Sequence, residues 1–216
     1  MVRTKMIIQY DGTNYHGFQR QINAHTVQQE IEQCLHKLTA ENITIISAGR
    51  TDAGVHALGQ VIAFDSNSTI PPERFDLALN TILPSDIRAL KSALARPDFN
   101  PRYDAVKKQY RYLIYRKKEK AIFYRNYACC FNRELNIKAM QKACKVIEGK
   151  HDFKPFSSTG SSAKTSERTV YKCTLTEKEP FLILDISANG FLYNMVRIIV
   201  GTLFKIGMGR LKHDIA

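Results

Sequence analysis

Residues 43–65 read ITIISAGRTDAGVHALGQVIAFD, and the rest of the chain is interpreted around this stretch. It opens with β-branched residues and closes with a second apolar run, Gln60 to Phe64, and both runs suit strands. Between them lies a loop of small residues with glycines at positions 49, 54 and 59. Glycines supply the backbone freedom that a tight loop needs, and small neighbours let a ligand come close. The stretch therefore predicts a hairpin whose loop backbone leaves room for a ligand.

That loop contains a single carboxylate. Asp52 follows Arg50 by two residues. A carboxylate beside a guanidinium stays ionised and oriented, as a nucleophile or a base must be. The same residues also fit an ordinary Asx-type turn at Asp52-Ala53-Gly54. Spacing alone favours the turn, so a catalytic interpretation needs support from the rest of the chain.

Composition indicates an anionic partner. The 216 residues can form one large domain or two small ones with a substantial core. They include 32 Lys and Arg against 20 Asp and Glu, for a net charge of +12. Nucleic acid is the first candidate for such a basic chain, and a basic enzyme without a nucleic-acid partner is the alternative.

Several classes of site are not indicated. The five cysteines form no C-x-x-C pair, which argues against zinc and disulfides and favours a reducing cytoplasm. No phosphate-binding loop or metalloprotease motif is found, so we expect no metal and no nucleotide cofactor. The N-terminus leads straight into a predicted strand, without a signal peptide. The most apolar run, residues 191–208, contains charged residues and predicts a buried helix, with no membrane partner.

The first half of the chain has an α+β pattern. Residues 5–10 predict a strand, and a polar loop with aromatic residues follows over 11–21. Thr26 begins a predicted helix, because Gln29 three residues later completes a capping box. After the central hairpin, the pattern predicts a helix from Pro72 to about Leu83 and a strand over 87–94.

The second half repeats this pattern without repeating the sequence. Residues 96–102 are predicted to cross from the first half to the second. Further strands and helices are predicted over residues 107–115, 137–147, 169–176, 181–187 and 191–206. We therefore expect an α+β fold of two similar halves, 1–98 and 99–216. Their antiparallel sheets would join across a central active-site cleft, with helices on the outer face.

Positive charge is concentrated between Asn100 and Arg125. Nine Lys and Arg face two acidic residues there, and six Tyr and Phe are interleaved with them. Cations attract phosphates, and aromatic faces stack on unpaired bases, which is how RNA is usually bound. The alternative is a solvated basic strand whose aromatic residues belong to the core.

Arg197 is the second unusual feature, because it lies in an otherwise apolar predicted helix. A buried guanidinium needs an acceptor, and Asp52 is an attractive one. Alternatively, Arg197 lies on a solvent-facing edge of the helix.

The block from Gly49 to Ala57 resembles the signature of the TruA-type tRNA pseudouridine synthases. The resemblance covers essentially the whole chain and continues in Tyr10-Asp11-Gly12-Thr13, Gln19-Arg20-Gln21, Thr26-Val27-Gln28, Phe99-Asn100-Pro101-Arg102-Tyr103-Asp104-Ala105, Tyr110-Arg111-Tyr112, Arg168-Thr169 and Asn194-Met195-Val196-Arg197.

The resemblance implies a pseudouridine synthase-like fold and an isomerase acting on uridines 38, 39 and 40 of the tRNA anticodon arm. It assigns Asp52 as the catalytic carboxylate, Tyr110 as the partner of the target base, Arg197 as the partner of the aspartate and Arg50 as a helper in displacing the nucleotide. It also implies a homodimer. Further candidates for RNA binding are Arg20, Lys107, Lys108, Arg111, Lys164 and Arg168.

Two departures from the family pattern stand out. Phe18 occupies a position that is usually Trp. Relatives commonly continue for about thirty residues past Ala216, so we expect the last helix and strand to be missing and a sheet edge to be exposed. A non-catalytic RNA-binding module, or a truncated and inactive form, is therefore the alternative function, and an RNA hydrolase is a more distant one.

Overall fold

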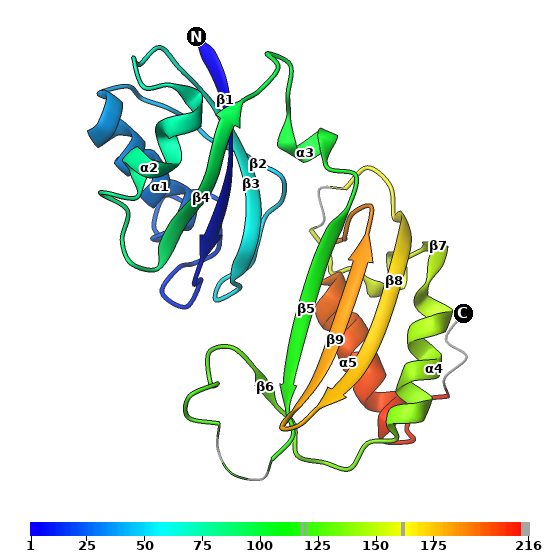
Figure 1. Cartoon of the computed structure of the whole chain (residues 1–216). Helices are drawn as coiled ribbons and strands as arrows, with labels where there is room; N and C mark the ends of the chain where they lie inside the picture. The colour runs from blue at the N-terminus through cyan, green and yellow to red at the C-terminus, as the bar shows by residue number, and fades with distance from the viewer. Residues whose placement is uncertain (118, 120, 161–162, 213–216) are drawn as a thin grey trace. The chain divides into compact units, whose positions relative to one another are not determined.

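The computed structural model describes residues 1–212 except 118, 120 and 161–162. The chain forms two compact units, Met1–Ala105 and Val106–Ala216 (Figure 1).

The first unit is built on a four-stranded antiparallel sheet in the order β2-β3-β1-β4. Its strands are β1 (Val2–Tyr10), β2 (Ile46–Ser47), β3 (Ala57–Ser66) and β4 (Ile87–Leu94). Its helical segments are α1 (Val27–Thr39), the 3₁₀ turn η1 (Pro72–Arg74), α2 (Phe75–Leu79) and α3 (Pro101–Asp104).

Strand β1 runs through the middle of this sheet and shows why one face is covered. Met6, Ile8 and Tyr10 are buried, whereas the residues between them are exposed, as expected of a strand with one face on a core. Helix α1 contributes Ile31 and Leu35 to the same core. The Thr26 side chain caps α1 by accepting a hydrogen bond from the Gln29 amide at 3.3 Å, so the predicted helix start is confirmed.

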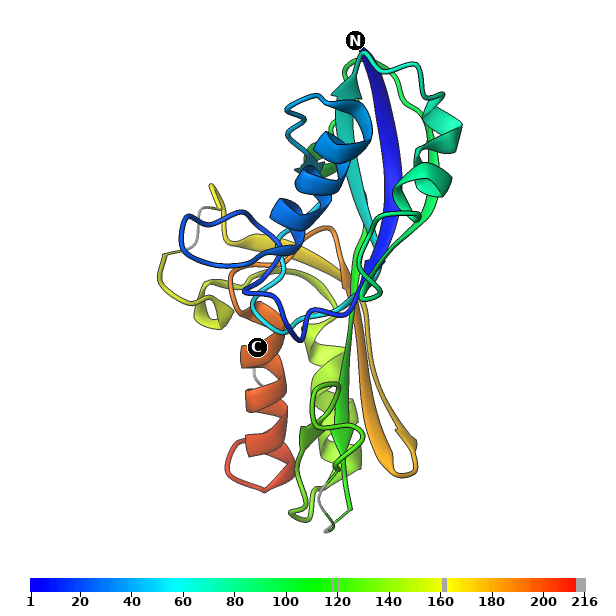
Figure 2. The ribbon, with the colours of Figure 1, turned by 90° about the vertical axis from the view of Figure 1, so that its left-hand side faces the viewer.

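The second unit has a five-stranded sheet in the order β6-β5-β9-β8-β7 (Figures 1 and 2). Its strands are β5 (Lys108–Tyr115), β6 (Cys129–Cys130), β7 (Gly149–Asp152), β8 (Glu167–Lys178) and β9 (Phe181–Ala188). Helices α4 (Ile137–Ile147) and α5 (Met195–Gly207) pack together, and the 3₁₀ turn η2 (Lys154–Phe156) lies against α5. Leu182, Leu184 and Ile186 of β9 face the core that these helices close.

The predicted α+β class with two sheets is confirmed, and β4 has the predicted bounds. Three details of the prediction are wrong. Helix α2 ends at Leu79 rather than Leu83, because the Asn80 side chain bonds both backbone groups of Ala89 in β4. The second detail is the repeat of an antiparallel pattern, because the pair β5–β6 is parallel and each unit has more elements than the predicted repeat. The joining of the sheets across a cleft stays a prediction.

The third detail concerns residues 43–45, which were predicted to be part of a strand. The strand β2 begins only at Ile46. The backbone of Ile45 bonds instead to side chains of helix α1, because its N–H donates to Glu32 and its carbonyl accepts from Gln28. Side chains of α1 therefore make the hydrogen bonds to the Ile45 backbone that a neighbouring strand would otherwise make.

The unit boundary after Ala105 places α3 in the first unit. A division after residue 98, as the sequence suggested, assigns this helix to the second half.

Candidate active site

Asp52 lies in the loop of residues 48–56, which connects β2 to β3 and is called the Asp52 loop below. The loop begins with a hydrogen bond from the Ala48 amide to the Val61 carbonyl at 2.8 Å. The Val55 amide donates to the Asp52 carbonyl at 3.1 Å, so Asp52 opens a tight turn, and Gly54 adopts a left-handed φ of 73° within it. The turn and the catalytic interpretation are therefore compatible, because the backbone makes the turn while the Asp52 residue is exposed.

A second segment, residues 11–18, holds the Asp52 loop from the side of strand β1. The Phe18 amide donates to the Thr51 carbonyl at 3.0 Å, and the Gly54 amide donates to the Tyr15 carbonyl at 3.3 Å. These two bonds flank Asp52 on both sides. The buried Tyr10 hydroxyl also bonds the Thr51 hydroxyl at 2.8 Å, which ties the loop to the end of β1.

Two glycines make this approach possible. A Cβ atom on Gly12 would lie 2.1 Å from the Val55 carbonyl oxygen. A Cβ atom on Gly17, which has a φ of 92°, would lie 2.7 Å from the Thr51 carbonyl oxygen. Real Cβ atoms do not come this close to backbone, so only glycine fits at either position. Sequence reasoning named the glycines of the Asp52 loop and missed these two, although Gly12 stands in the quoted Tyr10-Asp11-Gly12-Thr13 motif.

Side chains fix the ends of the 11–18 segment. The Tyr15 hydroxyl donates to Asp86 at 2.7 Å, and burial together with this carboxylate raises the pKa of Tyr15 well above its usual value. His56 places its Nδ1 atom 2.9 Å from the Asp11 carboxylate and 3.1 Å from the Gly12 amide. The Asp52 loop is thus held before any substrate binds, which is the preorganisation that a catalytic group requires.

Tyr110 and Arg197 lie in the second unit. Tyr110 is in β5, and its ring meets Phe191 edge to face at a centroid distance of 5.0 Å. Arg197 is in the first turn of α5 and is exposed. Burial, followed by contact with Cys129, raises the pKa of Tyr112, while the positive charge of Arg197 opposes this rise.

Arg50 is exposed in the Asp52 loop, two residues before Asp52. Asp52 and Arg50 thus belong to the first unit, and Tyr110 and Arg197 belong to the second. An ion pair between Asp52 and Arg197 stays a prediction.

The cations proposed for RNA binding have different surroundings. Arg111 makes a two-pronged ion pair with Asp185 on β9 at 2.8 and 3.0 Å. Arg20 is paired with Glu32 at 3.3 Å, and Arg168 donates to the Thr165 carbonyl at 3.0 Å. Lys107 and Lys164 are exposed, and Lys108 is half-buried. Lys118 and Lys120 of the basic segment lie outside the described residues.

Within the described ranges, no group of three or more His, Cys, Asp or Glu side chains is arranged to hold a metal ion. None of the described helices combines the length and the apolar character that crossing a membrane requires.

Comparison with known proteins decides the family. The family model described as tRNA pseudouridine synthase matches residues 6–104 and 143–216. The chain belongs to the tRNA pseudouridine synthase family. The matched residues include Asp52 and Arg197 and leave out the segment with Tyr110.

Curated relatives of the same family extend along nearly the whole chain. A protein of Syntrophomonas wolfei named tRNA pseudouridine synthase A is 56% identical over 97% of this chain and 84% of its own length. Proteins of the same name from Acetivibrio thermocellus and Caldicellulosiruptor bescii are 48% and 49% identical, over 99% and 96% of this chain and 88% and 85% of their own lengths. Family membership confirms the prediction of an isomerase of the pseudouridine synthase class that acts in tRNA modification.

The close backbone approach in this pseudouridine synthase leads to a prediction about Gly12. Gly12→Ala introduces a methyl group against the Val55 backbone, so the free energy of unfolding should fall by about 1–3 kcal/mol and tRNA modification should fall with it. Thermal unfolding and turnover would be measured together. Gly59→Ala is the matched control, because its Cβ meets only Ile7 at 3.8 Å. Equal stability of the two variants would contradict the packing argument.

Proposed function

We propose that this enzyme converts uridines 38, 39 and 40 of the tRNA anticodon stem-loop to pseudouridine, with Asp52 as the catalytic carboxylate. The observation that carries the proposal is the exposed Asp52 residue on a loop whose neighbouring backbone groups, at Thr51 and Gly54, are hydrogen-bonded to the 11–18 segment. An accessible acid on a fixed backbone is what a reaction at an extruded nucleotide needs.

The chemistry explains why a carboxylate is required. Uridine becomes pseudouridine when the bond between N1 and C1′ breaks, the uracil turns, and C5 bonds to C1′. The C5 proton then leaves to solvent, and N1 takes up a proton from solvent. Breaking the first bond develops positive character at the sugar, which an ionised carboxylate stabilises. Asp52 can do this as a nucleophile at C1′ or as a base that removes a sugar proton. Substrate and product have the same composition, so no co-reactant is consumed.

The other site residues have complementary roles in this proposal. The target base is stacked within the anticodon arm and must be extruded, and the exposed Arg50 can take part in displacing it. The Tyr110 ring would lie against the extruded uracil, and Arg197 would pair with Asp52 and keep it ionised. We further propose that the enzyme works as a homodimer in the cytoplasm, with both subunits contacting one tRNA.

Phosphate contacts are proposed for lysines of the second unit that are at least partly exposed. Lys107 and Lys164 are exposed, and Lys108 is half-buried beside Lys107. Exposed aromatic side chains in the basic segment, such as Phe123 with 87% of its surface accessible, offer stacking surfaces for unpaired bases. Arg111 contributes less to phosphate binding, because Asp185 neutralises it.

The first test of the proposal is the change Asp52→Asn. It removes the charge and preserves the shape of the side chain, so turnover should fall below detection while tRNA affinity stays within about threefold of the wild type. Release of tritium from C5-labelled uridine in unmodified tRNA measures turnover. Asp98→Asn is the control, because Asp98 also follows an arginine, Arg96, by two residues and is highly exposed.

Undiminished tritium release by Asp52→Asn would remove Asp52 from the mechanism. Absence of release from the wild-type protein, with tRNA binding intact, would favour the non-catalytic RNA-binding module.

The second test is the salt dependence of tRNA binding. If on the order of six to ten phosphates are contacted, affinity should fall about 10³-fold or more between 50 and 200 mM salt. A Lys107→Gln variant should lower the slope of log Kd against log salt by about one. Lys145→Gln is the control, because Lys145 already pairs with Glu148 at 3.1 Å. A flat response of the wild-type protein would contradict binding through phosphates.

A further inference from the structure

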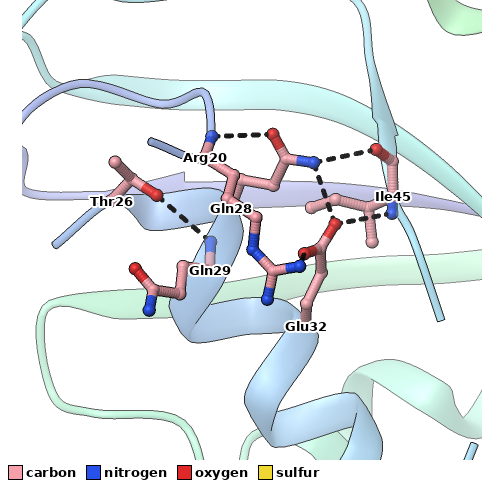
Figure 3. A network of polar contacts seen from close by, with 6 residues as sticks. All are labelled: Arg20, Thr26, Gln28, Gln29, Glu32 and Ile45. Carbon is pink, nitrogen blue, oxygen red and sulfur yellow. Dashed lines mark hydrogen bonds and ion pairs between the residues drawn. The ribbon is translucent and has the colours of Figure 1, made fainter. Parts of the chain in front are cut away.

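We infer that Glu32, in the middle of helix α1, is a positioning residue for the Asp52 loop and that Arg20 acts through it. This inference rests on the proposed role of Asp52. It is carried by the group of contacts in Figure 3, which joins three segments of the first unit around one buried carboxylate.

Glu32 holds the chain just before the Asp52 loop. Its Oε1 atom accepts the Ile45 amide at 3.1 Å and the Gln28 side-chain amide at 2.8 Å. The same Gln28 amide lies 3.4 Å from the Ile45 carbonyl oxygen. Both backbone groups of Ile45 are therefore bound by helix α1, immediately before strand β2 leads into the Asp52 loop.

The side chains of Gln28 and Glu32 also hold residues 17–20, the segment that contacts the Asp52 loop at Thr51. The guanidinium of Arg20 lies 3.3 Å from the second oxygen of Glu32, and the Arg20 amide donates to the Gln28 side chain at 3.0 Å. The first amides of α1 continue this contact, since Val27 donates to the Gly17 carbonyl and Gln28 to the Phe18 carbonyl. Phe18 in turn donates its amide to Thr51, the neighbour of Asp52.

Burial explains why the charge of Glu32 matters. The residue is only 5% exposed, and a carboxylate removed from water must be compensated by donors. Three donors meet its two oxygens, namely the Ile45 amide, the Gln28 amide and the Arg20 guanidinium. A glutamine at this position offers one oxygen and adds a donor, so it cannot satisfy all three.

Loss of any of these contacts would affect the Asp52 loop at two places, at its start and at Thr51. On one side Ile45 is free to shift together with β2, and on the other side the 17–20 segment loosens its hold on Thr51. Displacements of about 1 Å at a reacting group can lower turnover about a hundredfold without a change in the group itself. Because phosphate contacts are proposed for Lys107, Lys108 and Lys164 of the second unit, we expect a shift of this kind to alter kcat rather than KM.

The decisive variant is Glu32→Gln, compared with Glu30→Gln on the same helix. Glu30 pairs with His25, whose side chain is more exposed than that of Glu30. In the described contacts Glu30 touches neither Ile45 nor Arg20. We expect Glu32→Gln to lower kcat between tenfold and a hundredfold at saturating tRNA, with KM within threefold of the wild type, and Glu30→Gln to retain wild-type kcat. Thermal unfolding curves would verify that each variant is folded at the temperature of the assay.

A wild-type kcat for folded Glu32→Gln, beside an inactive Asp52→Asn, overturns the inference and leaves the proposed function standing. Full activity of Asp52→Asn overturns the proposed function instead.

Arg20→Ala provides a second test that does not depend on a buried substitution, since the Arg20 side chain is 55% exposed. If Arg20 acts through Glu32, kcat falls several-fold and the slope of log Kd against log salt is unchanged. A slope lowered by about one, with kcat unchanged at saturating tRNA, shows a phosphate contact and contradicts the inference.

Discussion

The first unit depends on the direct contact of two backbone segments, the Asp52 loop and residues 11–18. Gly12 and Gly17 have no side chain, so the Val55 carbonyl approaches the Gly12 backbone and the Thr51 carbonyl approaches the Gly17 backbone. A methyl group at either position would leave no room for this approach. Backbone contacts of this kind have little rotational freedom, and two hydrogen bonds beside Asp52 complete them. Asp52, the proposed catalytic residue, can therefore be accessible while its backbone is held in place.

Helix α1 is the part of the unit that supports this contact. Its first turn is capped in the usual way by Thr26. Gln28 also binds the backbone of Arg20, and Glu32 binds the backbone of Ile45. A charged residue in a helix face that packs on a sheet is expensive unless it is fully paired. In the proposed mechanism the substrate is extruded and held against Asp52, so a loop that moved would lose the alignment on which turnover depends.

Local features were predictable from the sequence, and tertiary ones were not. The cap at Thr26, the strand Ile87–Leu94 and the loop around Asp52 follow from residue preferences within a few positions. The partners of Ile45 and the close approach of Gly12 involve residues distant in the sequence, and nothing in the spacing of Gly12 or Glu32 indicates which backbone each one meets. The resemblance to the family proposes roles for Asp52, Tyr110 and Arg197, but it does not reveal what holds the loop in place. Apolar periodicity left both a buried and an edge position open for Arg197, and the residue is exposed on α5.

The central claim is that the Asp52 loop is held in position in the absence of RNA. Amide hydrogen exchange of Phe18 and Gly54 in the free protein tests it most directly, because these two amides make the bonds that flank Asp52. The account predicts that both exchange slowly, with protection comparable to the central strand β1. Exchange of both amides at the rate of an unstructured loop would contradict it.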